Sequence, residues 1–156
     1  MRTFGSVDEL AAAVGETLGP GPWFRIDQNR VDLFADATDD HQWIHVDPER
    51  AAAGPYGGTI AHGYLTLSLL PALVGSLYWV QGVRMGVNYG LNRVRFPAPV
   101  RVGAAVRAAA TIAEVSPVDG GVQLVAAATV ECDAGGKPVC VAETVSRLYV
   151  GPATDS

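Results

Sequence analysis

The hydrophobic pattern of the chain is most pronounced at residues 61–80, where the sequence reads AHGYLTLSLLPALVGSLYWV. This run carries no charged side chain, and it lies within a longer stretch, 51–83, that also lacks Asp, Glu, Lys and Arg. A surface helix shows a polar face, whereas a helix that is apolar on nearly every side is buried. We therefore expect a long helix over 61–80 that other elements of the fold cover all round.

The residues before this run predict short helices. Ser6 and Glu9 have the spacing of a capping box, ahead of a helix over 10–14. A first strand is expected at 23–26, and Asp27 can then cap a helix that runs to about residue 37. Asp47 can cap a third helix, which Gly54 would end.

The residues after Gly82 predict strands, because β-branched side chains are frequent and Pro and Gly-Gly pairs separate the runs. The predicted strands cover 83–91, 93–96, 100–115, 122–132 and 139–150, with a bulge near Gly103. Short helices, one long apolar helix and then antiparallel strands favour an α+β domain. In this fold a curved antiparallel sheet would wrap around the central helix.

The length of 156 residues and the hydrophobic content of 49% fit one domain, 1–156, with a substantial core. The net charge of −5 argues against nucleic-acid binding, which requires a basic surface. Between Glu49 and Glu114 the chain nevertheless has six arginines and no acidic residue. These arginines belong either to solvated strand faces or to the rim of a pocket that attracts a small anionic ligand.

The chain shows no membrane or secretion signal. The first 18 residues include Asp8, Glu9 and Glu16 and no apolar run long enough for a signal peptide. The apolar run 64–80 is shorter than the roughly 20 residues that span a bilayer, and it contains Pro71. We therefore expect a cytoplasmic protein that does not enter a membrane.

The two cysteines, Cys132 and Cys140, flank a turn-like segment with Gly135 and Gly136. A two-residue loop would place Cys132 opposite Val139, and Cys140 would then point to the other face of the sheet. A three-residue loop could pair them. Free thiols in a reducing compartment are the expected state.

All three histidines lie between residues 41 and 62, at His41, His45 and His62. Asp40 and His45 could project from a loop into one cleft and act on a shared water as general acid and base. The alternative is that these groups cap helices and bind their own backbone. His62 could face a ligand, or it could cap a helix or be satisfied in the core.

A metal centre is not expected. His41 and His45 have the i, i+4 spacing of a helical metal pair, but the sequence offers no clear third ligand. The chain also lacks the Gly-x-Ser-x-Gly and P-loop motifs, so serine hydrolase and nucleotide hydrolase functions have no support.

Three segments carry a family resemblance. They are Phe34-Ala35-x-x-Thr38-x-Asp40-x-Gln42-Trp43-Ile44-His45-x-Asp47, Ile60-Ala61-His62-Gly63, and Val94-Arg95-Phe96-x-x-Pro99-Val100-x-Val102-Gly103. In this order the segments resemble the MaoC-like (R)-specific enoyl-CoA hydratases, which have the hotdog fold. The resemblance spans about 31–106 and is closest in detail to the branch grouped with nodulation protein N.

The resemblance implies a reaction and a set of roles. Asp40 and His45 would be the catalytic pair in the reversible hydration of a trans-2-enoyl-CoA to an (R)-3-hydroxyacyl-CoA. The N–H of Gly63 would donate to the thioester oxygen. Residues with an expected role in substrate binding are Gln42, His62, Arg93 and Arg95, the two arginines as partners of the CoA phosphates.

The resemblance further implies a homodimer, a place in fatty-acid metabolism, and no need of a metal or organic cofactor. The sequence departs from the family pattern at three positions. Asp39 replaces a Gly, and Gln42 and Trp43 replace Asn and Pro. These changes leave the acid–base pair intact, and Trp43 is expected to fill core volume.

Two other functions remain open. A hotdog thioesterase uses the same wrapped helix and often a carboxylate that activates water, and fold alone does not separate the two activities. The chain could also be a non-catalytic protein that binds acyl-CoA or acyl-carrier protein. The Asp40 and His45 pair favours hydration.

Overall fold

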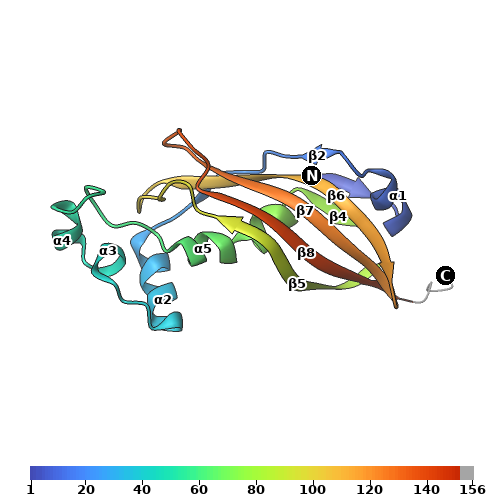
Figure 1. Cartoon of the computed structure of the whole chain (residues 1–156), viewed down its shortest axis with the longest axis horizontal. Helices are drawn as coiled ribbons and strands as arrows, with labels where there is room; N and C mark the ends of the chain where they lie inside the picture. Colours follow the sequence, from blue (N-terminus) through green and yellow to red (C-terminus); the bar gives the residue numbers. More distant parts are fainter. Residues whose placement is uncertain (152–156) are drawn as a thin grey trace.

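The structure is a computed structural model that describes residues 1–151 (Figure 1). The predicted domain, 1–156, extends beyond this part, so its last five positions lie outside the described residues. The helices are α1 (Val7–Ala12), α2 (Gln28–Thr38), α3 (Trp43–Val46), α4 (Pro48–Ala52), α5 (Gly63–Ser68) and α6 (Leu70–Gly75). The strands are β1 (Arg2–Phe4), β2 (Thr17–Leu18), β3 (Phe24–Arg25), β4 (Tyr78–Val80), β5 (Val83–Arg95), β6 (Ala105–Val118), β7 (Gly121–Cys132) and β8 (Cys140–Val150).

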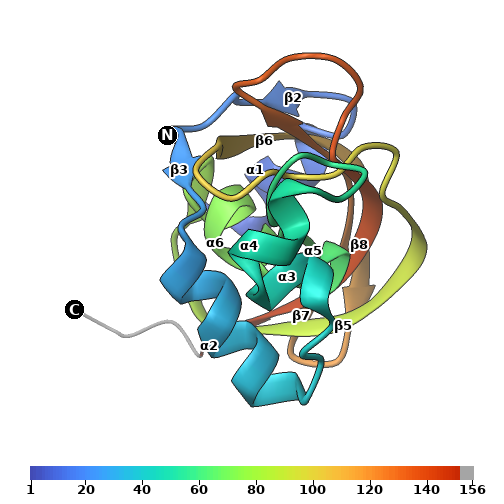
Figure 2. The same ribbon diagram turned by 90° about the vertical axis from the view of Figure 1, so that its left-hand side faces the viewer.

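The main sheet is antiparallel, with the strand order β2-β6-β7-β8-β5, and β3 also pairs with β6. Alternate residues of β6 are buried, as expected for a strand with one face on the core. Several buried positions of the sheet hold alanine, among them Ala108 and Ala110 on β6 and Ala128 on β7. Small side chains let the helix backbone lie close to the sheet. The sheet therefore curves around α5 and α6, which run along its concave face (Figures 1 and 2).

The central helix is shorter than the predicted 61–80. It begins at Gly63, continues through Leu69 in helical conformation and ends at Gly75. The prediction was wrong for Tyr78–Val80, which forms β4 and pairs in parallel with β1. Aromatic and β-branched residues favour strands, and β1 offers β4 a partner.

The expectation that this helix is covered on every side was also wrong. Leu65, Leu69 and Leu73 are buried against the sheet, and each such side chain contributes about 1.5–3 kcal/mol by leaving water. On the other side Tyr64 is 70% exposed, and Pro71 is exposed as well. The helix is thus wrapped by the sheet on one side and open on the other.

The caps of the short helices form as predicted, although α1 spans Val7–Ala12 rather than 10–14 and α3 was not expected. The backbone N–H of Glu9 donates to Ser6 Oγ at 3.2 Å, and that of Arg30 donates to Asp27 Oδ1 at 2.9 Å. Asp47 caps α4 through the N–H of Arg50 at 3.0 Å. Figure 1 shows α2, α3 and α4 together at one end of the sheet, next to the start of α5.

The strand bounds differ in two places from the prediction. β5 is one strand from Val83 to Arg95 with register shifts against β8, where two strands were expected. β6 begins at Ala105, because the chain turns at Gly103. The φ of Gly103 is 97°, which lies in the left-handed region that glycine adopts without strain. The bulge predicted near Gly103 was therefore wrong, and the irregularity of β6 lies between Ile112 and Glu114.

The expectation of free thiols is confirmed, since Cys132 and Cys140 are buried and unpaired. The predicted register was wrong by one residue, because the N–H of Val139 donates to the carbonyl of Val130. Burial raises the pKa of Cys140 to about 11. Within residues 1–151, no helix is long and apolar enough to cross a membrane.

Candidate active site

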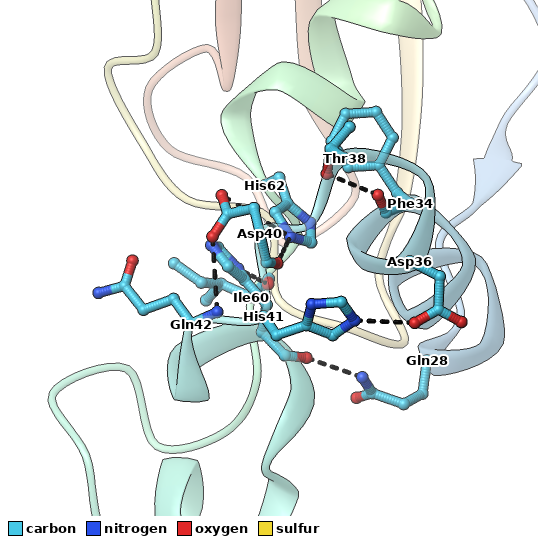
Figure 3. Close-up of polar contacts among 10 residues, drawn as sticks. Gln28, Phe34, Asp36, Thr38, Asp40, His41, Gln42, Ile60 and His62 are labelled. Atoms are coloured by element: carbon cyan, nitrogen blue, oxygen red, sulfur yellow. Dashed lines mark hydrogen bonds and ion pairs between the residues drawn. The ribbon is translucent and has the colours of Figure 1, made fainter.

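The loop after α2 brings Asp40 to the start of the central helix. α2 ends at Thr38, and Asp39 then takes the left-handed conformation with φ 58° and ψ 21°. This conformation commonly ends helices, and it turns the chain sharply. The Asp40 carboxylate is 50% exposed, and its Oδ1 accepts a long hydrogen bond, 3.5 Å, from the N–H of Gln42 (Figure 3).

His45 lies in α3 and is only 6% exposed. Its Nδ1 is 2.6 Å from the carbonyl oxygen of Ile60. A carbonyl can only accept, so Nδ1 carries the proton and Nε2 keeps a lone pair. Burial lowers the pKa of His45, and His62 adds to this effect, while the Ile60 carbonyl and Asp40 act in the opposite direction. The site therefore holds an uncharged imidazole that can accept a proton.

His62 lies beside both groups (Figure 3). Its Nε2 is 2.9 Å from the backbone oxygen of Asp40 and 4.0 Å from Oδ2 of the same residue. Its ring stacks on that of His45 with a centroid distance of 3.8 Å and an angle of 23°. The side chains of Asp40, His45 and His62 thus meet at one place, although they come from three segments of the chain.

Gln28 connects this place to the first turn of α2. Its side-chain N–H donates to the carbonyl of His45 at 2.8 Å (Figure 3). Its Oε1 accepts from the hydroxyl of Thr59 at 2.7 Å. Sequence reasoning missed Gln28. A glutamine in the first turn of an amphipathic helix carries no signal that it will reach two distant segments.

Gly63 begins the central helix next to a cleft of about 350 Å³. The first N–H groups of a helix have no acceptor inside the helix, so that of Gly63 is available to a ligand. The cleft is lined mainly by apolar groups, and its polar edge includes His45, Gly63 and Thr66. A Cβ at position 63 would lie 2.9 Å from the ring of Phe96, which explains why glycine stands there.

Comparison with known proteins identifies the family. The model of the MaoC like domain matches residues 9–134. The chain belongs to the MaoC-like dehydratase family. Among its relatives, 3-hydroxyacyl-thioester dehydratase Z of Mycobacterium tuberculosis is 58% identical over 94% of this chain and 98% of its own length. Nodulation protein N of Rhizobium leguminosarum is 43% identical over 94% of this chain and 93% of its own length.

Structures of the same family share the fold. An (R)-hydratase of A. caviae superimposes with a TM-score of 0.69 at 25% identity, covering 86% of this chain and 96% of its own. An (R)-hydratase of Pseudomonas aeruginosa gives a TM-score of 0.71 at 24% identity, covering 88% of this chain and 83% of its own. The hotdog fold expected from the resemblance is therefore confirmed, and so is the family.

Of the predicted site residues, His45 and Gly63 line the cleft of this dehydratase domain. Those that do not line it are Asp40, Gln42, His62, Arg93 and Arg95. Gln42 is exposed and is the N-cap of α3, without a capping bond from its side chain. Arg93 and Arg95 are exposed on β5, and Arg95 donates to the backbone oxygen of Val94 at 2.7 Å. His62 is 2% exposed and bonds Asp40, so the structure places it behind the cleft.

Trp43 is half-buried, and its ring packs on Gly54 and under the guanidinium of Arg50 at 4.4 Å. It is not among the residues that line the cleft, in keeping with a packing role. His41 lies outside as well, paired with Asp36 at 2.8 Å, and this hydrogen bond raises the pKa of His41.

Asp40, His45 and His62 could each offer a metal-ligand atom within 4.8 Å of the others. Two features count against a metal there. Nε2 of His62 already donates to the Asp40 carbonyl, and stacked imidazoles direct their in-plane lone pairs side by side rather than to one point. The expectation of a metal-free site stays a prediction.

A second, larger cavity of about 720 Å³ lies along the same helix of the dehydratase domain. α5 and α6 contribute Leu67, Leu70 and Val74, and β5 contributes residues from Gly86 to Leu91. Its walls are mostly apolar, and it is about twice the size of the cleft at His45.

Proposed function

We propose that the protein catalyses the reversible hydration of trans-2-enoyl-CoA to (R)-3-hydroxyacyl-CoA. One observation carries the proposal: the buried imidazole of His45 and the carboxylate of Asp40 come within 4.8 Å of each other, and His45 lines the same cleft as Gly63, the first residue of the central helix. This arrangement supplies a base, a second group to hold a water, and a donor for a developing oxyanion. The relative named as a 3-hydroxyacyl-thioester dehydratase supports the substrate class.

In the proposed reaction, Nε2 of His45 and the carboxylate of Asp40 hold one water between them. His45 is suited to take a proton from this water, because its Nδ1–H is fixed on the Ile60 carbonyl and its Nε2 has the lone pair. The oxygen of the water adds to C3 of the enoyl group, and the proton that His45 has taken is delivered to C2, which returns His45 to its uncharged form. The elements of one water are thereby added, and the reverse sequence is the dehydration.

Negative charge develops on the thioester oxygen during the addition. The N–H of Gly63 can donate to this oxygen, and the helical run from Gly63 to Gly75 adds a favourable dipole at its N-terminal end. Loss of one such donor in other enzymes costs about 10²–10³ in rate.

The larger cavity along the helix is the proposed place for the acyl chain, because its walls are mostly apolar and include the core side chains Leu70, Leu124 and Leu148. We retain Arg93 and Arg95 as proposed partners of the CoA phosphates, since both are exposed cations near Phe96 in sequence. Reversing both charges should raise the KM for enoyl-CoA without changing kcat. An unchanged KM would contradict this assignment.

A homodimer is also proposed. β5 pairs only with β8 in the described sheet, so its other edge offers free backbone groups. Met85, Val87, Tyr89 and Leu91 on this strand are exposed, which is unusual for so many large apolar side chains. Light scattering after gel filtration should give twice the mass of the chain, and a monomer at micromolar concentration would refute the proposal.

The decisive experiment is hydration of crotonyl-CoA, followed through the loss of the enoyl absorbance. The wild type should hydrate it, and Asp40→Asn and His45→Ala should each lower kcat by about 10²–10⁴-fold. An inactive wild type, or unchanged rates in both variants, would refute the proposal. Release of free CoA would indicate the alternative thioesterase, and binding without turnover would indicate an acyl-CoA binding protein. Such a hydratase would be expected in cytoplasmic fatty-acid metabolism.

A further inference from the structure

The burial of His62 leaves one of its ring nitrogens without a partner in the described part of the chain, and capping does not account for it. His62 is the N-cap of α5, but its side chain makes no capping bond. It is 2% exposed, and its Nδ1 has no hydrogen-bond partner among the described residues. A buried polar atom without a partner lowers stability, whereas an apolar side chain of similar shape carries no such cost. A histidine at this position therefore has a stability cost that calls for another reason.

The contacts of His62 point to that reason. Its Nε2 bonds the backbone oxygen of Asp40 at 2.9 Å, which means that Nε2 carries the proton and donates it. This carbonyl belongs to the residue directly after the left-handed turn at Asp39. Holding the carbonyl fixes the peptide plane, and with it the direction in which the Asp40 carboxylate leaves the backbone. The distance of 4.0 Å from Nε2 to Oδ2 keeps the carboxylate itself free of a short bond to His62.

The ring of His62 also sits between two other rings. On one side it stacks on His45 at 3.8 Å, and it meets the ring of Phe34, from α2, at 5.0 Å and an angle of 56°. The ring of His45 is thus supported across its face by His62 while its edge is held by Ile60. One side chain touches both members of the proposed acid–base pair.

We propose that His62 is a positioning residue: its Nε2–H holds the Asp40 carbonyl and its ring supports His45, so that the two groups keep the spacing needed to share one water. This inference rests on the hydration proposed above. His62 contacts neither the substrate nor the water in this role, and it acts through Asp40 and His45.

The first test is a matched pair of substitutions. In His62→Gln the amide nitrogen can reach the position of Nε2, whereas in His62→Asn the side chain is one methylene shorter and cannot. His62→Phe keeps an aromatic ring and removes the donor. Asn and Phe, which lose the donor, should lower kcat by about 10- to 100-fold, in line with the effect of small displacements of catalytic groups. Gln keeps the donor and loses only the support of the ring, so its kcat should fall less, by about threefold at most. The KM should change little in all three variants.

A second readout separates positioning from support of the fold. The Phe variant should melt at the same temperature as the wild type or higher, because the unpaired Nδ1 is gone, although its kcat falls. If His62 only supported the fold, the Phe variant would melt at a lower temperature than the wild type and keep its kcat. Wild-type kcat in the Asn and Phe variants, or an equal loss in the Gln variant, would overturn the donor role.

The pH profile supplies a third readout. The titratable groups that face His45 are Asp40, from the loop after α2, and His62, from the start of α5. His62 contributes to the lowered pKa of His45, so its replacement by a neutral side chain should move the acid limb of kcat/KM to higher pH. An acid limb that stays in place in every variant would overturn the contact between the two rings.

The role of His62 can also be tested without turnover. Nitrogen-15 NMR of the wild-type imidazoles should show the proton of His62 on Nε2 and that of His45 on Nδ1. The opposite tautomer at His62 would overturn the inference whether or not the protein hydrates enoyl-CoA. An inactive wild type with the expected tautomers would refute the proposed function and leave the structural arrangement standing.

Discussion

Substitution of Gly63 by alanine tests how closely the start of the central helix must approach the substrate. The added Cβ would lie 2.9 Å from Cδ2 of Phe96 and 3.1 Å from both Cε2 and Cγ. Carbon atoms pack at about 3.5–4.0 Å, so the ring or the helix must move by roughly 0.5–1 Å. Phe96 is 39% exposed and can swing outward, which limits the stability cost to about 1–3 kcal/mol.

The catalytic cost of Gly63→Ala should be larger than its stability cost. The backbone N–H is still present in the variant, but the clash with Phe96 displaces this donor, or the ring that lines the cleft beside it, or both. A misplacement of about 1 Å can reduce rates about 10²-fold, so we expect kcat for crotonyl-CoA to fall by about 10- to 100-fold. Steady-state kinetics and thermal melting of the same preparation measure both effects.

Gly75→Ala is the matched control with crotonyl-CoA, because Gly75 ends the same helical run, a Cβ there would meet nothing within 4 Å, and the short crotonyl chain need not fill the larger cavity that Gly75 lines. This variant should keep wild-type kcat, with a stability that is unchanged or higher by about 0.5–1 kcal/mol. Adding Phe96→Ala to Gly63→Ala should restore stability by removing the clash. Wild-type kcat in Gly63→Ala, or an equal loss in Gly75→Ala, would refute the proposed role of the helix start.

Three further predictions concern groups around the site. Because burial lowers the pKa of His45 and the uncharged form is the base, kcat/KM should be constant through neutral pH and fall on the acid side with a midpoint below about 6.5; a midpoint above this value would contradict the assignment. Asp39→Gly should be more stable than Asp39→Ala by about 1 kcal/mol in urea unfolding, since the φ of 58° favours glycine; equal stability would contradict this. Gln28→Leu should lose about 1–3 kcal/mol by leaving the Thr59 hydroxyl and the His45 carbonyl unpaired, and the Thr59→Val, Gln28→Leu double variant should lose less than the sum of the single changes.

The parts of the fold that the sequence predicts correctly depend on local chemistry. Asp27 and Asp47 cap helices because a carboxylate can reach backbone N–H groups three residues ahead, whatever the rest of the chain does. The end of the central helix depends on a distant partner instead. Tyr78–Val80 continues an apolar run that suits a helix, but β1, more than 70 residues earlier, pairs with it and draws it into a strand. No window of sequence around Tyr78 contains that partner.

The site also has features that local sequence predicts and features that depend on distant residues. Asp40 and His45 lie within one loop and helix, so their spacing and a family pattern are enough to single them out. The tautomer of His45 depends on the carbonyl of Ile60, and the place of the Asp40 carbonyl depends on His62, 22 residues away. Gln28 adds a third long-range contact. Which groups face substrate and which face each other is decided by packing between α2, α3 and the start of α5.

The three departures from the family pattern become intelligible once the backbone is known. Asp39 occupies a left-handed position at the end of α2, where glycine is the residue of least strain. Its charge helps to raise the pKa of His41, which lies outside the site. Gln42 stands at the N-cap of α3, a position that suits asparagine, and Trp43 at the first helical residue, which suits proline. At all three positions the family residue favours a backbone conformation that this chain adopts without it. The path from α2 to α3 is therefore preserved, and with it the meeting of Asp40 and His45, at a cost in local stability that the packing of Trp43 against Gly54 and Arg50 helps to offset.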